Sequence, residues 1–173
     1  ECGLNLHDTM IWEKTGTPYP SLVRYNGIFE YMFVFSKNKP KTFNPIKKPN
    51  KTAGMFRKSA NYRQKDGGQV AREMNVSEFG NKNNIWVIKN GFKESSKDKI
   101  AFEHPAIFPE KLAHDHIISW SNEGDLVYDP FLGSGTTAKM AKKIKRKYIG
   151  SEINKDYFKI AQERIRRTQE YFF

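Results

Sequence analysis

The chain has 173 residues, of which 38% are hydrophobic, and a net charge of +11, which allows one domain or one and a half with a real core. Its single cysteine, Cys2, excludes a disulfide framework and favours an intracellular setting. The sequence shows no apolar run near the roughly 20 residues of a membrane helix, no signal peptide and no metal-ligand spacing. It begins at Glu1 without an initiator methionine, so we expect a fragment of a longer protein.

Two strands are predicted within residues 1–36. The first covers residues 6–12. The second covers residues 28–36 and has the strongest strand pattern of the chain, because it is rich in aromatic and β-branched residues. We expect the two to pair as a long hairpin at a sheet edge. Glu30 is polar on an otherwise apolar strand, and we interpret it as a buried structural acid rather than a catalytic group.

Residues 37–100 are predicted to be an irregular, basic insert, with a short helix at 70–79 and a strand or extended linker at 85–88. Between residues 37 and 72 there are eight lysines and three arginines against one acid, Asp66. A concentrated basic segment indicates a polyanion partner, and the alternative is a solvated loop without a ligand. Side chains able to stack on bases favour nucleic acid; they are Phe43, Met55, Phe56 and Tyr62.

The remaining residues, 101–173, have the pattern of an α/β unit. A proline-framed turn at 104–109 precedes an amphipathic helix predicted at 110–120. A strand at 126–129, a glycine-rich turn, a helix at about 136–147 and a second strand at 148–151 follow. Asn154 is a suitable N-cap for a last helix through 166, whose sheet-facing residues would be Tyr157, Ile160, Ala161 and Ile165.

The glycine-rich turn carries the chemistry. Asp129 stands at the carboxyl end of a strand, where ligands of open α/β sheets bind, and its carboxylate can pair with a ligand ammonium. Gly133 and Gly135 let backbone approach a ligand, and the hydroxyls that follow would cap the helix. Glu152, 23 residues after Asp129, stands where a ribose-binding acid belongs. No Gly-Lys-Ser/Thr follows the turn, so an amino acid joined to a nucleoside suits the site better than a nucleotide phosphate; S-adenosylmethionine fits this description.

Residues 129–137, Asp-Pro-Phe-Leu-Gly-Ser-Gly-Thr-Thr, resemble motif I of the DNA methyltransferases that modify adenine N6 or cytosine N4. Residues 150–154 resemble motif II, residues 104–112 resemble motif X, and residues 11–14 and 30–37 resemble two late strands of the catalytic half. The resemblance implies a Rossmann-like methyltransferase fold, with 101–173 as its cofactor-binding half. It also implies cofactor contacts from Asp129, Phe131, Gly133, Ser134, Gly135, Thr136, Thr137, Glu152, Ile153, His104 and Phe108. The alternatives are structural roles for the two acids and simple loop packing for His104 and Phe108.

The order of these motifs is the circularly permuted, β-type order of that family, with the target-recognition region in the position of the basic insert. The family's catalytic motif, Asp/Asn/Ser-Pro-Pro-aromatic, is absent, because no Pro-Pro occurs in the chain. We therefore expect that motif upstream of Glu1, assign no catalytic residue, and expect the 173-residue chain alone to be inactive.

The resemblance implies a site-specific, S-adenosylmethionine-dependent DNA methyltransferase that flips its target base, adenine N6 being favoured over cytosine N4. Double-stranded DNA is the expected partner, with a restriction endonuclease or a missing N-terminal half as further partners, in the cytoplasm. Alternatives are a non-catalytic DNA- or cofactor-binding remnant and a Rossmann-like enzyme of another class, such as an RNA or protein methyltransferase or a nucleotide oxidoreductase. Candidate DNA contacts are Lys47, Lys48, Lys51, Arg57, Lys58, Arg63 and Gln64. By chemistry alone the arginines suit guanine and the glutamine suits adenine, against phosphate contact or solvent.

Overall fold

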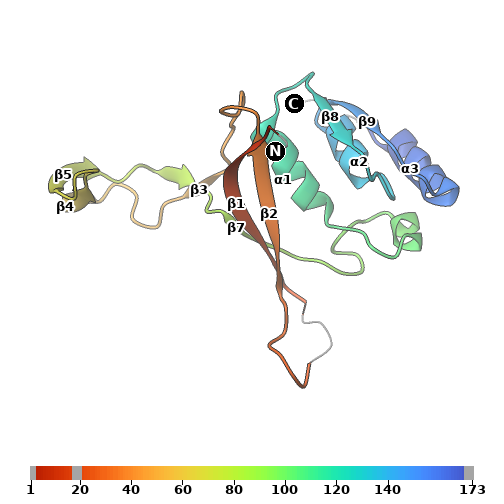
Figure 1. The fold of residues 1–173 in the computed structure, drawn as a ribbon, viewed down its shortest axis with the longest axis horizontal. Helices are drawn as coiled ribbons and strands as arrows, with labels where there is room; N and C mark the ends of the chain where they lie inside the picture. Colours follow the sequence, from red (N-terminus) through yellow and green to blue (C-terminus); the bar gives the residue numbers. More distant parts are fainter. Residues whose placement is uncertain (1–2, 17–20, 170–173) are drawn as a thin grey trace. The chain divides into compact units, whose positions relative to one another are not determined.

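The computed structural model describes residues 3–16 and 21–169, apart from the side chains of residues 58–62 and 71–72. The chain divides into two compact units, whose elements are drawn in Figure 1. The first unit combines Glu1–Asn44 with Asn84–Phe173, and the second is Pro45–Asn83, which lies inside the insert predicted at 37–100. Within the described ranges, no helix has both the length and the apolar character needed to cross a membrane.

A three-stranded sheet in the first unit is built around β1 (Asn5–Lys14). β1 pairs antiparallel with β2 (Phe29–Ser36) and parallel with β7 (Ile85–Ile88), which confirms the predicted hairpin and resolves 85–88 as a strand. Side chains two residues apart on a strand point to the same face. One face is therefore buried through alternate residues of two strands, namely Met10, Trp12, Trp86 and Ile88.

The prediction of a buried acid on β2 is wrong. The Glu30 side chain is 55% exposed and forms an ion pair with the ammonium of Lys14. The hairpin register places Trp12 opposite Glu30, so the acid lies near the end of β1 that carries Lys14. A carboxylate at this exposed end of the hairpin keeps contact with water while pairing with its neighbour, and burial is unnecessary.

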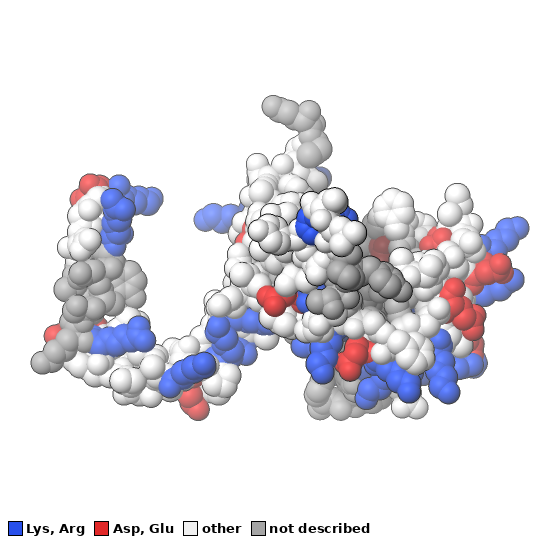
Figure 2. Space-filling view, turned by 90° about the horizontal axis from the view of Figure 1, so that it is seen from below, with Lys and Arg blue, Asp and Glu red and all other residues white. Residues whose placement is uncertain are grey.

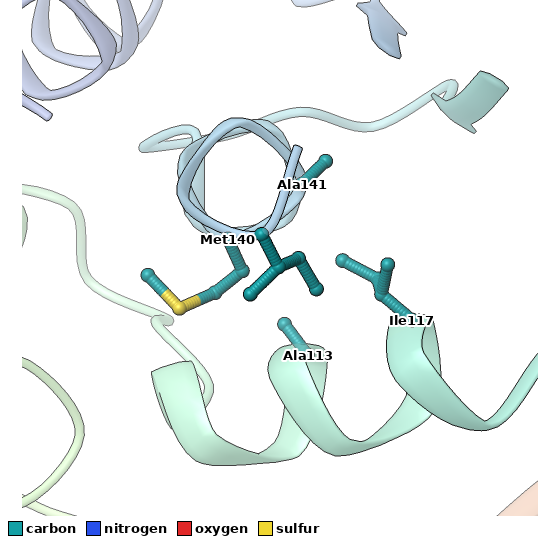
Figure 3. Close-up of a cluster of buried hydrophobic side chains, with 5 residues drawn as sticks. Ala113, Ile117, Met140 and Ala141 are labelled. Atoms are coloured by element: carbon teal, nitrogen blue, oxygen red, sulfur yellow. The ribbon is translucent and has the colours of Figure 1, made fainter. Parts of the chain in front are cut away.

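The helix α1 (Glu110–Trp120), with the predicted bounds, joins the sheet to α2 (Thr136–Lys143). On the sheet side, the His116 ring centroid lies 4.6 Å from that of Trp86, and its Nε2 lies 3.1 Å from the Met32 sulfur. On the opposite side, small and branched side chains allow close approach of α1 and α2 (Figure 3). This buried cluster consists of Ala113, Ile117, Met140, Ala141 and Ile144.

The C-terminal segment has the predicted strand–turn–helix–strand order, with β8 (Leu126–Asp129), α2, and β9 (Lys147–Gly150). The helix predicted to reach 147 ends at Lys143. The next turn reverses the chain through Lys145, which has a positive φ of 61°, so that β9 can return beside β8. The reversal takes residues that a local helical pattern assigns to the helix, because parallel pairing needs the chain back at the start of β8.

Two further helices complete the first unit. A 3₁₀ helix, η1 (Lys99–Glu103), precedes the proline-framed turn. The last helix, α3 (Lys155–Arg167), begins as predicted: the Asn154 side chain accepts hydrogen bonds from the amides of Asp156 and Tyr157, which otherwise lack helical partners.

The second unit is not irregular, as the sequence suggested, but is built from two antiparallel strand pairs. β3 (Lys47–Pro49) pairs with β6 (Phe79–Asn81), and β4 (Phe56–Arg63) pairs with β5 (Gln69–Asn75). β5 replaces the short helix predicted at 70–79. The pairing partner decides this, because each strand supplies the hydrogen bonds that an isolated extended segment lacks.

Candidate cofactor site

Two parallel strands end side by side at the candidate site. β8 and β9 pair with Asp129 opposite Gly150, so Asp129 and Glu152 leave the same edge of the sheet. Backbone hydrogen bonds close this edge: the Leu132 amide donates to the Ser151 carbonyl (2.9 Å), and the Ser151 amide donates to the Asp129 carbonyl (3.1 Å). The structure therefore brings together the two acids that the sequence singled out.

Glu152 is held by two backbone amides. Its Oε1 accepts from the Asn154 amide (2.8 Å) and its Oε2 from the Gly133 amide (2.7 Å). These bonds, the Asn154 bond first, lower the pKa of the Glu152 carboxyl below its ordinary value of 4.5 and outweigh partial burial, with a smaller contribution from His104. A carboxylate has about four acceptor sites, so two remain for the hydroxyls of a ligand.

Asp129 is held more loosely. Its Oδ1 accepts a hydrogen bond from the Phe131 amide at 3.0 Å, and the residue is half-buried. This local bond directs the carboxylate along the turn that follows β8. The second carboxylate oxygen accepts no side-chain or backbone hydrogen bond within the described part of the chain, which leaves it available to a ligand cation.

Gly133 lies against a histidine from the proline-framed turn. Its φ is +52°, and a Cβ added there would lie 3.2 Å from Nε2 of His104. The His104 ring is fixed from two sides: its Nδ1 accepts from the Ala106 amide (3.1 Å), and its centroid lies 4.3 Å from that of Tyr157. His104 therefore adjoins the glycine turn, and Tyr157 contacts this histidine at the candidate site.

Gly135 has a packing role that the sequence interpretation did not include. With φ at +81°, a Cβ at this position would lie 2.8 Å from Cβ and 2.9 Å from Cα of Ala161 on α3. Ala161 is fully buried. The absence of a side chain at 135 thus lets α3 approach the turn, and the space next to it is already filled by protein.

The hydroxyls after the turn do not cap the helix. Ser134 and Thr136 are 4% and 3% exposed, and both hydroxyls accept hydrogen bonds from Nη1 of Arg164, at 2.9 Å and 3.1 Å. The N-cap of α2 is Gly135, and no side chain caps it. Thr137 lies half-buried in the first helical turn. The predicted capping role is therefore wrong, because a buried guanidinium takes up both hydroxyls.

Sequence reasoning missed Arg164, which is the largest fully buried side chain of the site. The signal was present: Arg164 lies three residues after Ala161, on the stripe of α3 expected to face the protein interior. Burying a charged side chain in such a stripe has a high free-energy cost unless it has buried partners, so an arginine at this position predicts a buried polar network.

Exposed apolar side chains flank the two acids. Phe131 is 87% exposed and Ile153 is 99% exposed, one following each carboxylate. Phe108, 37% exposed, lines a neighbouring pocket of about 540 Å³. The other lining residues come from β1, β2, η1 and the loops around η1, and include Trp12, Lys14, Glu30, Phe102 and His104. Polar groups thus hold one end of the site, and apolar surfaces stand beside them.

The candidate DNA contacts of the second unit are exposed wherever their side chains are described. Lys47 Nζ donates to Asn81 Oδ1 (2.7 Å) and Lys48 Nζ to Asn83 Oδ1 (2.9 Å), while Arg57 Nη2 donates to Thr52 Oγ1 (3.3 Å). Lysine and arginine side chains stand out along the molecular surface (Figure 2). Of the other candidates, Lys51, Arg63 and Gln64 face solvent, and the side chain of Lys58 lies outside the described residues, as does that of Tyr62, one of the predicted stacking residues.

The fold and site define a class: an α/β protein of Rossmann-like type that presents two acids and a glycine turn at the carboxyl edge of parallel strands. A family model for DNA methylases matches residues 1–163, so the chain belongs to that family.

Known proteins agree with this family. The chain is 56% identical over 170 residues to the orphan methyltransferase M.BamHII of Bacillus amyloliquefaciens, covering 96% of this chain and 64% of that protein. It superposes on the M1.HpyAVI–SAM complex with a TM-score of 0.62 and 25% identity, over 94% of this chain and 63% of that one. The PvuII cytosine-N4-specific DNA methyltransferase shares the fold, with a TM-score of 0.65 and 20% identity over 95% and 52% of the chains. The chain therefore spans less than two thirds of each of these proteins.

Proposed function

We propose that this chain is the cofactor- and DNA-binding part of a site-specific DNA methyltransferase, which transfers a methyl group from S-adenosylmethionine to an exocyclic base amine. The observation that carries the proposal is the pair of acids at one sheet edge, with Glu152 ionised and held by the amides of Gly133 and Asn154. Membership of the DNA methylase family and the likeness to a SAM complex support it.

The chain's residues fit the parts of S-adenosylmethionine. Glu152 would hold the ribose hydroxyls, and the exposed side chains of Ile153 and Phe131 suit the faces of an adenine ring. Asp129 suits the ammonium of the methionine end, near the turn that carries His104 and Phe108. Ser134, Gly135 and Thr136 would contribute through the backbone shape of the turn, since their side-chain positions face protein. When bound, this group supplies an electrophilic methyl on a sulfonium.

The second unit would bind the DNA backbone. Its exposed lysines and arginines can neutralise phosphates, which makes affinity depend steeply on salt. The exocyclic amine of a base is reachable only after the base leaves the stack, so base flipping is part of the proposal. We place adenine N6 before cytosine N4 as the target, and mass spectrometry of nucleosides from methylated DNA distinguishes the two.

We further propose that the catalytic Pro-Pro motif lies in chain outside these 173 residues, in the permuted order. The lengths of the relatives support this, because about a third of M.BamHII is not matched.

Exposed apolar surface on β2 also supports a missing segment. Alternate residues of β2 form a row of ring contacts on the face away from the buried side, with ring centroids 5.3 to 6.2 Å apart. These residues are Phe29, Tyr31, Phe33 and Phe35, each about half exposed. We propose that an N-terminal segment of the same protein packs on these rings, since a continuous apolar patch is rare on the surface of a complete soluble protein.

A titration tests the cofactor proposal. Thermal-shift measurements on the purified chain should show stabilisation by S-adenosylmethionine and by its demethylated product, because a ligand that binds only the folded state raises the melting temperature. NAD should have no effect. A response to NAD without a response to either sulfur compound would instead place the chain among nucleotide oxidoreductases.

A further inference from the structure

Arg164 joins segments that are far apart in the sequence. Its side chain is fully buried within α3, and all three nitrogens of its guanidinium donate hydrogen bonds. Nη1 points to the glycine turn, where it donates to the Ser134 carbonyl at 2.6 Å in addition to the hydroxyls of Ser134 and Thr136. One planar group thus fixes three acceptors of the turn, which a flexible ammonium does not do equally well.

The other two nitrogens face acids that precede the glycine turn in sequence. Nη2 donates to Oε1 of Glu110 (2.9 Å) and Nε to Oδ2 of Asp98 (3.1 Å). Lys139 Nζ donates to the same two oxygens, at 2.7 Å and 2.6 Å. Two cations and two acids therefore form a closed network between α1, α2, α3 and the loop before η1.

Within this network, the two cations favour the ionised form of Asp98. Burial raises the pKa of the Asp98 carboxyl, but hydrogen bonds from Lys139 and Arg164 outweigh burial, so its pKa is lowered. Buried ion pairs contribute little net stability, because desolvation offsets attraction; their better attested effect is to fix one geometry. This network fixes the position of the turn relative to the start of α1.

The start of α1 matters because it directly follows the proline-framed turn. Glu110 is the first residue of α1, and Pro109 ends the segment that carries His104. His104 in turn lies against Gly133. Arg164 therefore connects both sides of the candidate site: through Ser134 it holds the glycine turn, and through Glu110 it holds the end of the segment that packs on that turn.

We propose that Arg164 is a positioning residue for the cofactor site, which holds the glycine-rich turn in register with the segment of residues 104–109. The inference rests on the proposed function of this site. Arg164 does not contact the cofactor; it acts through Ser134 and Glu110, and its loss loosens the two walls of the site relative to each other.

The test measures S-adenosylmethionine affinity by calorimetry, at a temperature where circular dichroism shows each variant folded. Arg164→Lys keeps the charge but loses the planar fork, and we expect a roughly tenfold higher Kd, the scale typical of residues that orient a binding group. Glu110→Gln keeps the side-chain shape and tests the same link from its other end. The double variant should lose less affinity than the product of the single losses, because both residues act in one network.

Two controls separate positioning from stability. Arg166→Met removes an exposed arginine of the same helix and should leave Kd unchanged. Ile117→Ala, in the buried cluster between α1 and α2, should lower the melting temperature while leaving the Kd of the folded protein unchanged.

The outcomes are distinct. Wild-type affinity in Arg164→Lys, with the wild-type chain binding normally, overturns this inference alone. An equal loss of affinity in Ile117→Ala also overturns it, because the effect would then follow stability. Absence of binding by the wild-type chain overturns the cofactor site together with the positioning role.

Discussion

At the scale of single residues, the two acids differ in how firmly they are held. Glu152 is fixed by amides from both sides of the site, whereas Asp129 has one local bond. The sequence identified both acids from their position after strands. It did not reveal that Glu152 also determines the position of the glycine turn, since the bond to Gly133 spans 19 residues.

Replacing Glu152 with glutamine should weaken S-adenosylmethionine binding and leave non-specific DNA binding nearly intact. The ionised form is favoured in the folded chain, because the pKa is lowered from 4.5. The contribution of the carboxylate is therefore present above pH 4.5 and lost as the pH falls through the lowered folded value. Calorimetry across this range should show wild-type affinity constant from about pH 7, where the ligand ammonium is still protonated, to about pH 5. Unchanged affinity in Glu152→Gln would refute the ribose assignment.

Gly135→Ala should destabilise the fold by about 2–4 kcal/mol, since it combines a left-handed conformation with overpacking against Ala161. Gly124→Ala is a matched control: its φ is +83°, but nothing lies within 4 Å of the added Cβ. It should cost only about 1–2 kcal/mol, the conformational part. Denaturant titration of both variants measures the difference. Equal losses would show that packing against α3 does not require a glycine.

At the scale of elements, the local sequence pattern predicted where a helix begins when a residue typical of helix starts stands there. Pro109 precedes α1 and Asn154 caps α3, and both helices begin as predicted. The local sequence pattern gave the wrong secondary structure where pairing between strands determined the conformation. α2 gives up its last turn so that β9 can return beside β8, and β5 is a strand because β4 provides its partner.

The lysines of β3, the short strand that pairs with β6, should contribute to the salt dependence of DNA binding. Lys47 and Lys48 are exposed on β3, and replacing both with glutamine should reduce the salt dependence of DNA binding by about two phosphate contacts, a change of about 1.8 in the slope of log K against log salt. Fluorescence anisotropy at several salt concentrations measures this slope. The double replacement Lys155→Gln/Lys159→Gln, at two exposed positions of α3, is the control with the same charge change. An unchanged slope in the β3 double variant would remove β3 from the DNA interface.

At the scale of the whole molecule, the described chain contains the candidate cofactor edge and a basic unit, and the comparisons extend over only part of each relative. The aromatic side chains on the exposed face of β2 are consistent with a further packing segment, because they remain half exposed in this chain. We therefore expect the proposed enzyme to use chain beyond these residues.

The 173-residue chain alone should not methylate DNA, because no Pro-Pro motif is present to hold the target amine. Incubation with tritiated S-adenosylmethionine and plasmid DNA, followed by counting of bound label, checks this. A longer protein that includes an upstream Asp/Asn/Ser-Pro-Pro-aromatic motif should incorporate label. Incorporation by the short chain itself would contradict the assignment of catalysis to another segment.

The sequence by itself determined the order of elements in the C-terminal segment, the acids at its strand ends and the likeness to DNA methyltransferases, because these depend on neighbouring residues. Only the tertiary structure determined which side chains of the glycine-rich turn contact which residues of α3. Gly135 adjoins Ala161, and the hydroxyls of Ser134 and Thr136 turn to Arg164, across 26 to 30 residues of chain. Such contacts arise when α3 packs on the turn, and no local periodicity encodes them. The glycine-rich turn thus adjoins the proposed ligand site on one side and a tightly filled protein interior on the other.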